Sequence, residues 1–149
     1  MIAILRPHSW DFPLFLHVFG AMVLFGAILA TTTLSFVGWR LPEVRAVSRS
    51  TFWALLAGAI PAWIVMRIGA QWAYSKEHHQ LFEGTPTWLA VGLGVADAGL
   101  IILLVATGFA FWWQRSQKAI AGRVVSGLAV LYLILLAVAW LAMSGKWGS

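Results

Sequence analysis

Four long apolar blocks, separated by short polar segments, dominate the chain. Each block has at least the roughly 20 residues that a helix needs to cross a hydrocarbon core of about 30 Å. None shows the alternation in runs of about ten residues that is typical of strands in a membrane β-barrel. The pattern predicts an all-α fold, a four-helix transmembrane bundle, with helices over about 12–37, 51–74, 88–113 and 124–143.

The connecting segments between these blocks are short, which makes consecutive helices antiparallel neighbours in an up-down-up-down bundle. We therefore expect a single transmembrane domain over 1–149. The first block is longer than the apolar core of a secretory signal peptide, about 7–15 residues. It is accordingly expected to be a retained helix.

The overall composition agrees with a membrane protein. Of the 149 residues, 61% are hydrophobic and only 10% are charged, whereas ordinary soluble domains have about 25% charged residues. A water-soluble fold of this length has too little interior for so much apolar mass. This excludes a soluble enzyme or a nucleic-acid-binding protein, although the formal net charge is +5. Because the chain has no cysteine, disulfides, thiolate metal sites and cysteine nucleophiles are excluded as well.

Basic residues are distributed unequally between the two sides of the predicted bundle. The segments 38–50 and 114–123 hold six of them, whereas Arg6, Lys76 and Lys146 are spread over the other three segments. By the positive-inside rule, the first and third connections face the cytoplasm and both termini lie on the non-cytoplasmic side. Nine of the ten tryptophans lie near block ends and are interpreted as interfacial anchors; Trp63 is the exception.

Two charged residues lie well inside the apolar blocks, Arg67 in the second and Asp97 in the third. At 1.5 Å per residue they lie about 8–10 Å and about 13 Å below the outer helix ends. A charge near a helix centre costs roughly 2.5–3.5 kcal/mol on insertion scales, and opposite charges at similar depth offset that cost. We therefore predict that Arg67 and Asp97 form an ion pair, either as part of a functional site or as a structural contact between helices.

The second block carries further polar residues around Arg67. Trp63 and Gln71 lie four residues before and after it, so the three side chains share one helix face. Pro61 removes a backbone hydrogen bond and predicts a kink in this helix. In the third block, the small residues Gly92, Ala96 and Gly99 predict close contact with another helix.

His17, in the first block, is the third ionisable residue expected inside the membrane. Gly20 and Ala21 follow on its face, which gives either a close helix contact or room for a flat ligand. His78 and His79 lie in the middle loop on the same side. They either reach over the mouth of a pocket or form a solvated pair.

Three stretches resemble bacterial membrane proteins. LHVFGAMVLFGAILA, residues 16–30, resembles the first helix of the copper-resistance D-type family and, more distantly, of membrane haem-containing protoporphyrinogen oxidases, whose first helix also carries an early histidine. PAWIVMRIGAQWAYSKE (61–77) and GVADAGLIILLVATG (94–108) resemble uncharacterised four-helix membrane proteins of actinobacterial type. The resemblance implies a multi-pass protein of the bacterial cytoplasmic membrane, and it connects the chain to haem b or copper through His17.

Three functions remain open from the sequence. The first is a polar pocket in the outer half that binds a cofactor or small molecule, with cofactor-binding residues His17, Trp63, Arg67, Gln71 and Asp97 and metal ligands His17, His78 and His79. The second is a small ion- or proton-coupled transporter using the Arg67–Asp97 pair, which at four helices implies a homodimer. The third is a non-catalytic interaction subunit of a larger membrane complex. Whether the protein is an enzyme stays open, and no catalytic residue is assigned.

Overall fold

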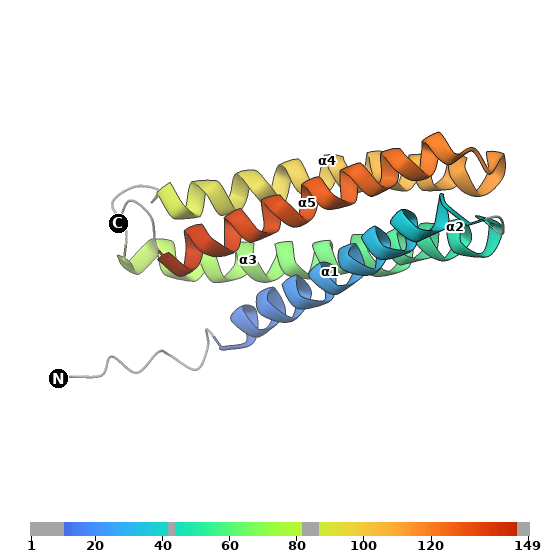
Figure 1. The fold of residues 1–149 in the computed structure, drawn as a ribbon. Coiled ribbons are helices and arrows are strands. Elements are labelled where there is room, and N and C mark those ends of the chain that lie inside the picture. The colour runs from blue at the N-terminus through green and yellow to red at the C-terminus, as the bar shows by residue number, and fades with distance from the viewer. Residues whose placement is uncertain (1–10, 42–43, 82–86, 146–149) are drawn as a thin grey trace.

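The computed structural model describes residues 11–41, 44–81 and 87–145. Helices form almost all of this part: α1 (Asp11–Gly38), α2 (Val44–Trp53), the π-helical segment η2 (Ala54–Ala59), α3 (Ile60–Leu81), α4 (Thr87–Ser116) and α5 (Ala119–Gly145). Because α2, η2 and α3 run on without interruption, the helices form four long antiparallel rods (Figure 1). Each rod is long and apolar enough to cross a membrane. The predicted four-helix bundle and its multi-pass membrane character are confirmed.

The four rods do not pack equally on one another. α1 packs along α3 and α5, and α4 packs along α5, whereas α3 and α4 make little direct contact. At one end of the bundle, α1 ends, α2 begins and α4 connects to α5, while α1 begins and α5 ends at the other end (Figure 1). We call the end at which α4 connects to α5 the basic end, because it carries Arg40, Arg45, Arg49, Arg115, Lys118 and Arg123.

The second rod is longer than predicted, because helix extends over residues 44–81 rather than 51–74. The polar sequence before Thr51 forms an amphipathic helix, in which Ser48 and Thr51 are buried. Their hydroxyls donate to the carbonyls of Arg45 (3.1 Å) and Val47 (2.8 Å), so that their burial leaves no hydroxyl unpaired. Gln117 also donates to the Ser48 hydroxyl at 3.3 Å and links the connection between α4 and α5 to α2.

A π-helical segment, Ala54–Ala59, precedes Pro61, where a kink was predicted. The N–H of Ile60 bonds to the carbonyl of Leu55, five residues earlier, as in a π-helix. Pro61 follows directly and has no N–H to donate. The irregular backbone thus occupies the middle of the second rod, between the basic end and the part that carries Trp63 and Arg67.

Small residues form the contact between α4 and α5, as predicted. Gly92, Ala96 and Gly99 are all buried. A Cβ atom at Gly99 would collide with the ring of Tyr132, and one at Gly92 would collide with the side chain of Met143. Close packing on α5 therefore fixes the rotation of α4 and, with it, the direction in which the neighbouring residues of α4 point.

Trp113 departs from the interpretation of tryptophans as interfacial anchors, because its side chain is fully buried at the basic end. A Cβ atom at Gly38 or at Gly122 would come within 3 Å of its ring, so these two glycines leave the space that the indole fills. The sequence signal failed because position alone does not separate a lipid-facing tryptophan from one that faces a neighbouring helix.

Candidate polar site between α3 and α4

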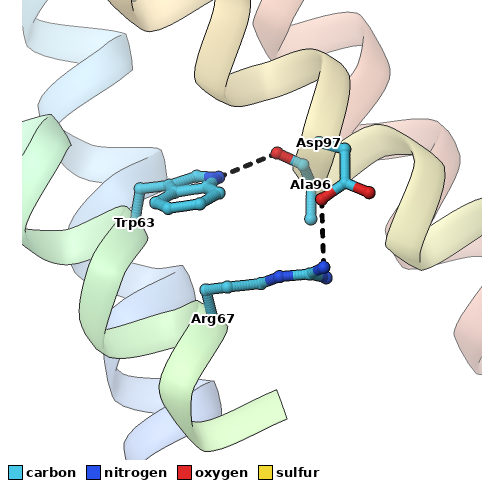
Figure 2. Close-up of polar contacts among 4 residues, drawn as sticks. All are labelled: Trp63, Arg67, Ala96 and Asp97. Atoms are coloured by element: carbon cyan, nitrogen blue, oxygen red, sulfur yellow. Dashed lines mark hydrogen bonds and ion pairs between the residues drawn. The ribbon is translucent and has the colours of Figure 1, made fainter. Parts of the chain in front are cut away.

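Arg67 of α3 and Asp97 of α4 form an ion pair, with 3.0 Å between Arg67 Nη2 and Asp97 Oδ1 (Figure 2). The pair predicted from the sequence is therefore confirmed. One nitrogen and one oxygen make the contact, so it is not the two-pronged arrangement that a guanidinium and a carboxylate can adopt. Each partner keeps hydrogen-bonding capacity that this contact does not use.

Trp63 makes a second polar contact one helical turn before Arg67. Its indole Nε1 donates to the carbonyl oxygen of Ala96 at 2.9 Å (Figure 2). Two successive turns of α3 thus hold two consecutive residues of α4, Ala96 and Asp97. These side chains therefore form two polar links between α3 and α4, which make little direct contact.

Ala96 is the member of the site that sequence reasoning did not find. Its contribution is a main-chain oxygen, and no property of an alanine side chain signals that its carbonyl accepts a bond from another helix. The neighbouring indole gave a partial signal, because Trp63 was the one tryptophan away from the expected interfaces.

The two charged residues differ strongly in exposure. The Asp97 side chain is 66% exposed on the flank of the bundle, and the Arg67 side chain is 26% exposed. Arg67 Nη1 is buried and has no hydrogen-bond partner in the described part of the chain. Asp97 comes ten residues after Thr87, about 15 Å along α4, within a helix that is long and apolar enough to cross a membrane.

Tyr132 of α5 adds a second unpaired polar atom to this level of the bundle. Its side chain is fully buried and its ring lies against Gly99, one turn of α4 beyond Ala96. Within the described residues its hydroxyl has no hydrogen-bond partner. Buried polar atoms without partners are rare in folded proteins, and each calls for a physical explanation.

His17 lies in the contact between α1 and α3. Its Nδ1 is 3.2 Å from the carbonyl oxygen of Met66; because a carbonyl only accepts, Nδ1 carries the proton in this bond. A Cβ atom at Gly20 would collide with the backbone of Met66, and one at Gly69 would collide with the backbone of His17. Of the two alternatives for this stretch, the structure has the close helix contact.

The close contact between α1 and α3 limits the space for a haem beside His17. The backbones of α1 and α3 meet on both sides of His17, so no width remains between these helices for a porphyrin beside the imidazole. In the ranges that the structure describes, no three histidine, aspartate or glutamate side chains are grouped to hold a metal ion. The surroundings of His17 thus do not fit a haem inserted between α1 and α3.

Of the other predicted site residues whose side chains are described, Gln71 takes no part in the ion pair. Gln71 lies one turn beyond Arg67 with its side chain exposed, and it makes no hydrogen bond within the described part of the chain. His78 and His79 were expected in a loop, but the backbone of α3 continues to Leu81 and includes both. Their side chains lie outside the described residues.

Chemically, the site combines a carboxylate that faces outward with a guanidinium that faces partly inward. Asp97 can accept hydrogen bonds, take up a proton or attract a cation, and Arg67 can donate through its free nitrogen. Comparison of the chain with models of protein families, with curated proteins and with solved structures finds no match.

Proposed function

We propose that the protein binds a small polar molecule at the Arg67–Asp97 pair, in the outer half of a bacterial cytoplasmic membrane. The observation that carries this proposal is the unused capacity of the pair. Arg67 Nη1 is buried without a partner, while Asp97 is two-thirds exposed and is held through one of its two oxygens. Both termini then lie on the non-cytoplasmic side, as the distribution of basic residues predicts.

The proposed ligand follows from the donors and acceptors that are left. A molecule that presents an acceptor to Arg67 and a donor or positive charge to Asp97 would satisfy both residues. The indole of Trp63 lies beside the Arg67 side chain (Figure 2) and adds an apolar ring next to the charges. These features favour an amphipathic molecule whose polar group reaches the pair from the exposed flank of the bundle.

Haem b and copper are the specific cofactors that the resemblance implies. Haem is poorly supported, because the packing around His17 does not fit a porphyrin between α1 and α3. The absorption spectrum of protein purified from haem-replete cells tests it directly. We expect no Soret band; a band that disappears in His17→Ala would overturn this reading, and metal analysis of the same sample tests copper.

Native mass spectrometry of the protein, released from lipid nanodiscs made from bacterial membranes, tests the main proposal. We expect a small molecule bound to the wild type and lost in Arg67→Gln and in Asp97→Asn. Gly127→Ala is a matched control, because this exposed glycine of α5 has nothing within 4 Å of its Cβ position. A wild type without any bound molecule, or a molecule kept by both pair variants, would contradict the proposal.

The single contact between the charges supports a second candidate, proton-coupled transport. Arg67 is held to Asp97 through the Nη2–Oδ1 contact, and protonation of Asp97 would remove the negative charge on which this contact depends. Proton flux into proteoliposomes loaded with a pH-sensitive dye tests this function. We expect the Asp97→Asn variant to lose flux, and full flux in that variant would exclude Asp97 as the proton carrier.

A further inference from the structure

The basic end gathers positive charge from two parts of the chain. Segments 38–50 and 114–123 contain six arginines and lysines against one acid, Glu43, which lies outside the described residues. All six basic side chains are exposed. The two carboxylates whose side chains are described, Asp11 and Asp97, lie away from this end. The basic end therefore carries an excess of positive charge that the described part of the chain does not neutralise.

Two of these arginines meet on one aromatic ring. The Cζ atom of Arg40 lies 4.7 Å from the centre of the Trp39 ring, and the Cζ atom of Arg123 lies 4.8 Å from it. The two guanidinium groups are therefore close together, although Arg40 follows the end of α1 and Arg123 belongs to α5. A guanidinium held by the face of an aromatic ring keeps its N–H donors available for another partner.

The surrounding packing positions both guanidinium groups. A Cβ atom at Gly122 would lie only 3.0 Å from Cβ of Trp39, so this glycine lets the start of α5 approach Trp39 closely. The next residue of α5 is Arg123. Arg40 has a second aromatic contact, because its Cζ atom also lies 4.1 Å from the ring centre of Phe36. The two donor groups are thus arranged by the fold itself.

The surface on the membrane side of the two arginines is exposed and apolar. On α1, Phe36 comes one turn before Arg40 and is 46% exposed. On α5, Gly127 and Val130 follow Arg123 at helical spacing and are exposed as well. Since α1 packs along α5, two neighbouring helices each present an apolar surface next to a guanidinium group.

We propose that Arg40, Trp39 and Arg123 bind the phosphate group of an anionic phospholipid. The lipid belongs to the leaflet at the basic end, which the positive-inside rule places at the cytoplasmic surface. Guanidinium groups form paired hydrogen bonds with phosphate oxygens, and clusters of basic residues beside membrane helices bind anionic headgroups.

The apolar surfaces distinguish a phospholipid from free phosphate. A phospholipid supplies acyl chains that cover the exposed parts of α1 and α5, whereas inorganic phosphate does not. The excess of basic residues favours an anionic headgroup, because the choline group of a zwitterionic lipid would bring another positive charge to this end. Both features of the ligand thus follow from residues around the two arginines.

This lipid site is separate from the proposed ligand site. Arg67 and Asp97 lie beyond the π-helical segment, in the half of the bundle away from the basic end. Arg67→Gln and Asp97→Asn should therefore keep an added phospholipid of known mass, even though we expect them to lose the molecule bound at the ion pair. Either proposal can fail while the other holds.

Native mass spectrometry of detergent-purified protein, titrated with phosphatidylglycerol or with phosphatidylcholine, tests the lipid site. We expect the wild type to bind phosphatidylglycerol at least about tenfold more tightly than phosphatidylcholine, the equivalent of about 1.4 kcal/mol. The double variant Arg40→Gln/Arg123→Gln should lose this preference. Arg45→Gln/Arg49→Gln is the matched control, because it removes the same charge from exposed residues of α2 at the same end and should keep the preference.

Three outcomes of this titration would overturn the proposal. The first is equal binding of the two lipids by the wild type. The second is an equal loss of phosphatidylglycerol binding in the two double variants, which would show that only the total charge matters. The third is displacement of the lipid by an equimolar concentration of inorganic phosphate, which would assign the arginines to free phosphate.

The variant Arg40→Lys/Arg123→Lys supplies a second measurement. It keeps the charge, and with it the orientation set by basic residues, but lysine lacks the planar fork of arginine. Both substituted positions are exposed, so the variant should fold. Phosphatidylglycerol should raise the thermal midpoint of the wild type, because a ligand of the folded state stabilises it, and should raise that of the lysine variant less. Equal shifts, followed by circular dichroism in detergent, would contradict a site built by the two arginines.

Discussion

Trp63 donates its indole N–H across 2.9 Å to the carbonyl of Ala96, and thereby joins two helices that otherwise pack on different neighbours. α3 rests mainly on α1, and α4 rests mainly on α5. The bond holds the part of α4 next to Asp97 at a fixed distance from α3, which lets the Arg67 side chain span the gap. Trp63 is therefore a positioning residue for the ion pair.

Trp63→Phe tests this role, because phenylalanine keeps an aromatic ring and removes the donor. We expect the free energy of unfolding to fall by roughly 0.5–1.5 kcal/mol, as for other hydrogen bonds between membrane helices. Unfolding in mixed micelles with increasing SDS measures the change. As a control, Trp140→Phe alters a largely exposed tryptophan of α5 and should have little effect. Equal losses in the two variants would argue against a special role for Trp63.

The ion pair itself is tested by a double-mutant cycle with Arg67→Gln and Asp97→Asn. Each single variant leaves the other charge without its partner at membrane depth, so each should lower stability. The double variant should recover part of the summed loss, giving a coupling energy between about 0.5 and 3 kcal/mol. The same SDS titration measures all four proteins, and additive losses would show that the two charges do not stabilise each other.

The contact between α1 and α3 makes opposite predictions for two glycines of the same helix. Gly20→Ala places a methyl group against the backbone of Met66 and should lower the thermal midpoint by several degrees. Gly26→Ala meets nothing within 4 Å and should leave the midpoint unchanged or raise it, because alanine favours helix by about 1 kcal/mol. Thermal unfolding in detergent, followed by circular dichroism, compares the two variants. Equal midpoints would mean that α1 and α3 are not in backbone contact.

Tyr132→Phe removes a buried hydroxyl that has no partner within the described residues. An unsatisfied hydroxyl in an apolar interior costs about 1–3 kcal/mol, so its removal should leave stability unchanged or increase it. Tyr132→Ala should be destabilising by about 3–5 kcal/mol because it opens a cavity. Loss of the small molecule bound to the wild type, without loss of stability in Tyr132→Phe, would instead place the hydroxyl in the binding site.

The sequence predicted the features that depend on one helix or on charge at a given depth. The four apolar blocks gave the four rods, and two opposite charges on antiparallel neighbours gave the contact between Arg67 and Asp97. In both cases the cost of placing polar groups in hydrocarbon leaves few alternatives. The helical spacing of small residues also correctly placed Gly92, Ala96 and Gly99 in a contact between helices.

Features that depend on the packing of particular surfaces were not predictable. The helix before Thr51 reads as a polar loop, yet Ser48 and Thr51 bury their hydroxyls by bonding them to their own helix backbone. Trp113 has the sequence position of an interfacial residue, and only the glycines that face it show that it belongs to the interior. The carbonyl of Ala96 has no sequence signature at all.

The π-helical segment at Ala54–Ala59 has a consequence for how the ion pair depends on chain length. Such a segment contains about one residue more than an α-helix of equal rotation, and each residue turns a helix by about 100°. Deleting one residue there would therefore give regular α-helix with the same rotation and keep Arg67 on the side that faces Asp97. Deleting one residue from the regular helix between this segment and Arg67 would instead turn Arg67 away from Asp97 by about 100°. The meeting of the two charges is thus set by the number of residues between this segment and Arg67 as much as by the identities of Arg67 and Asp97.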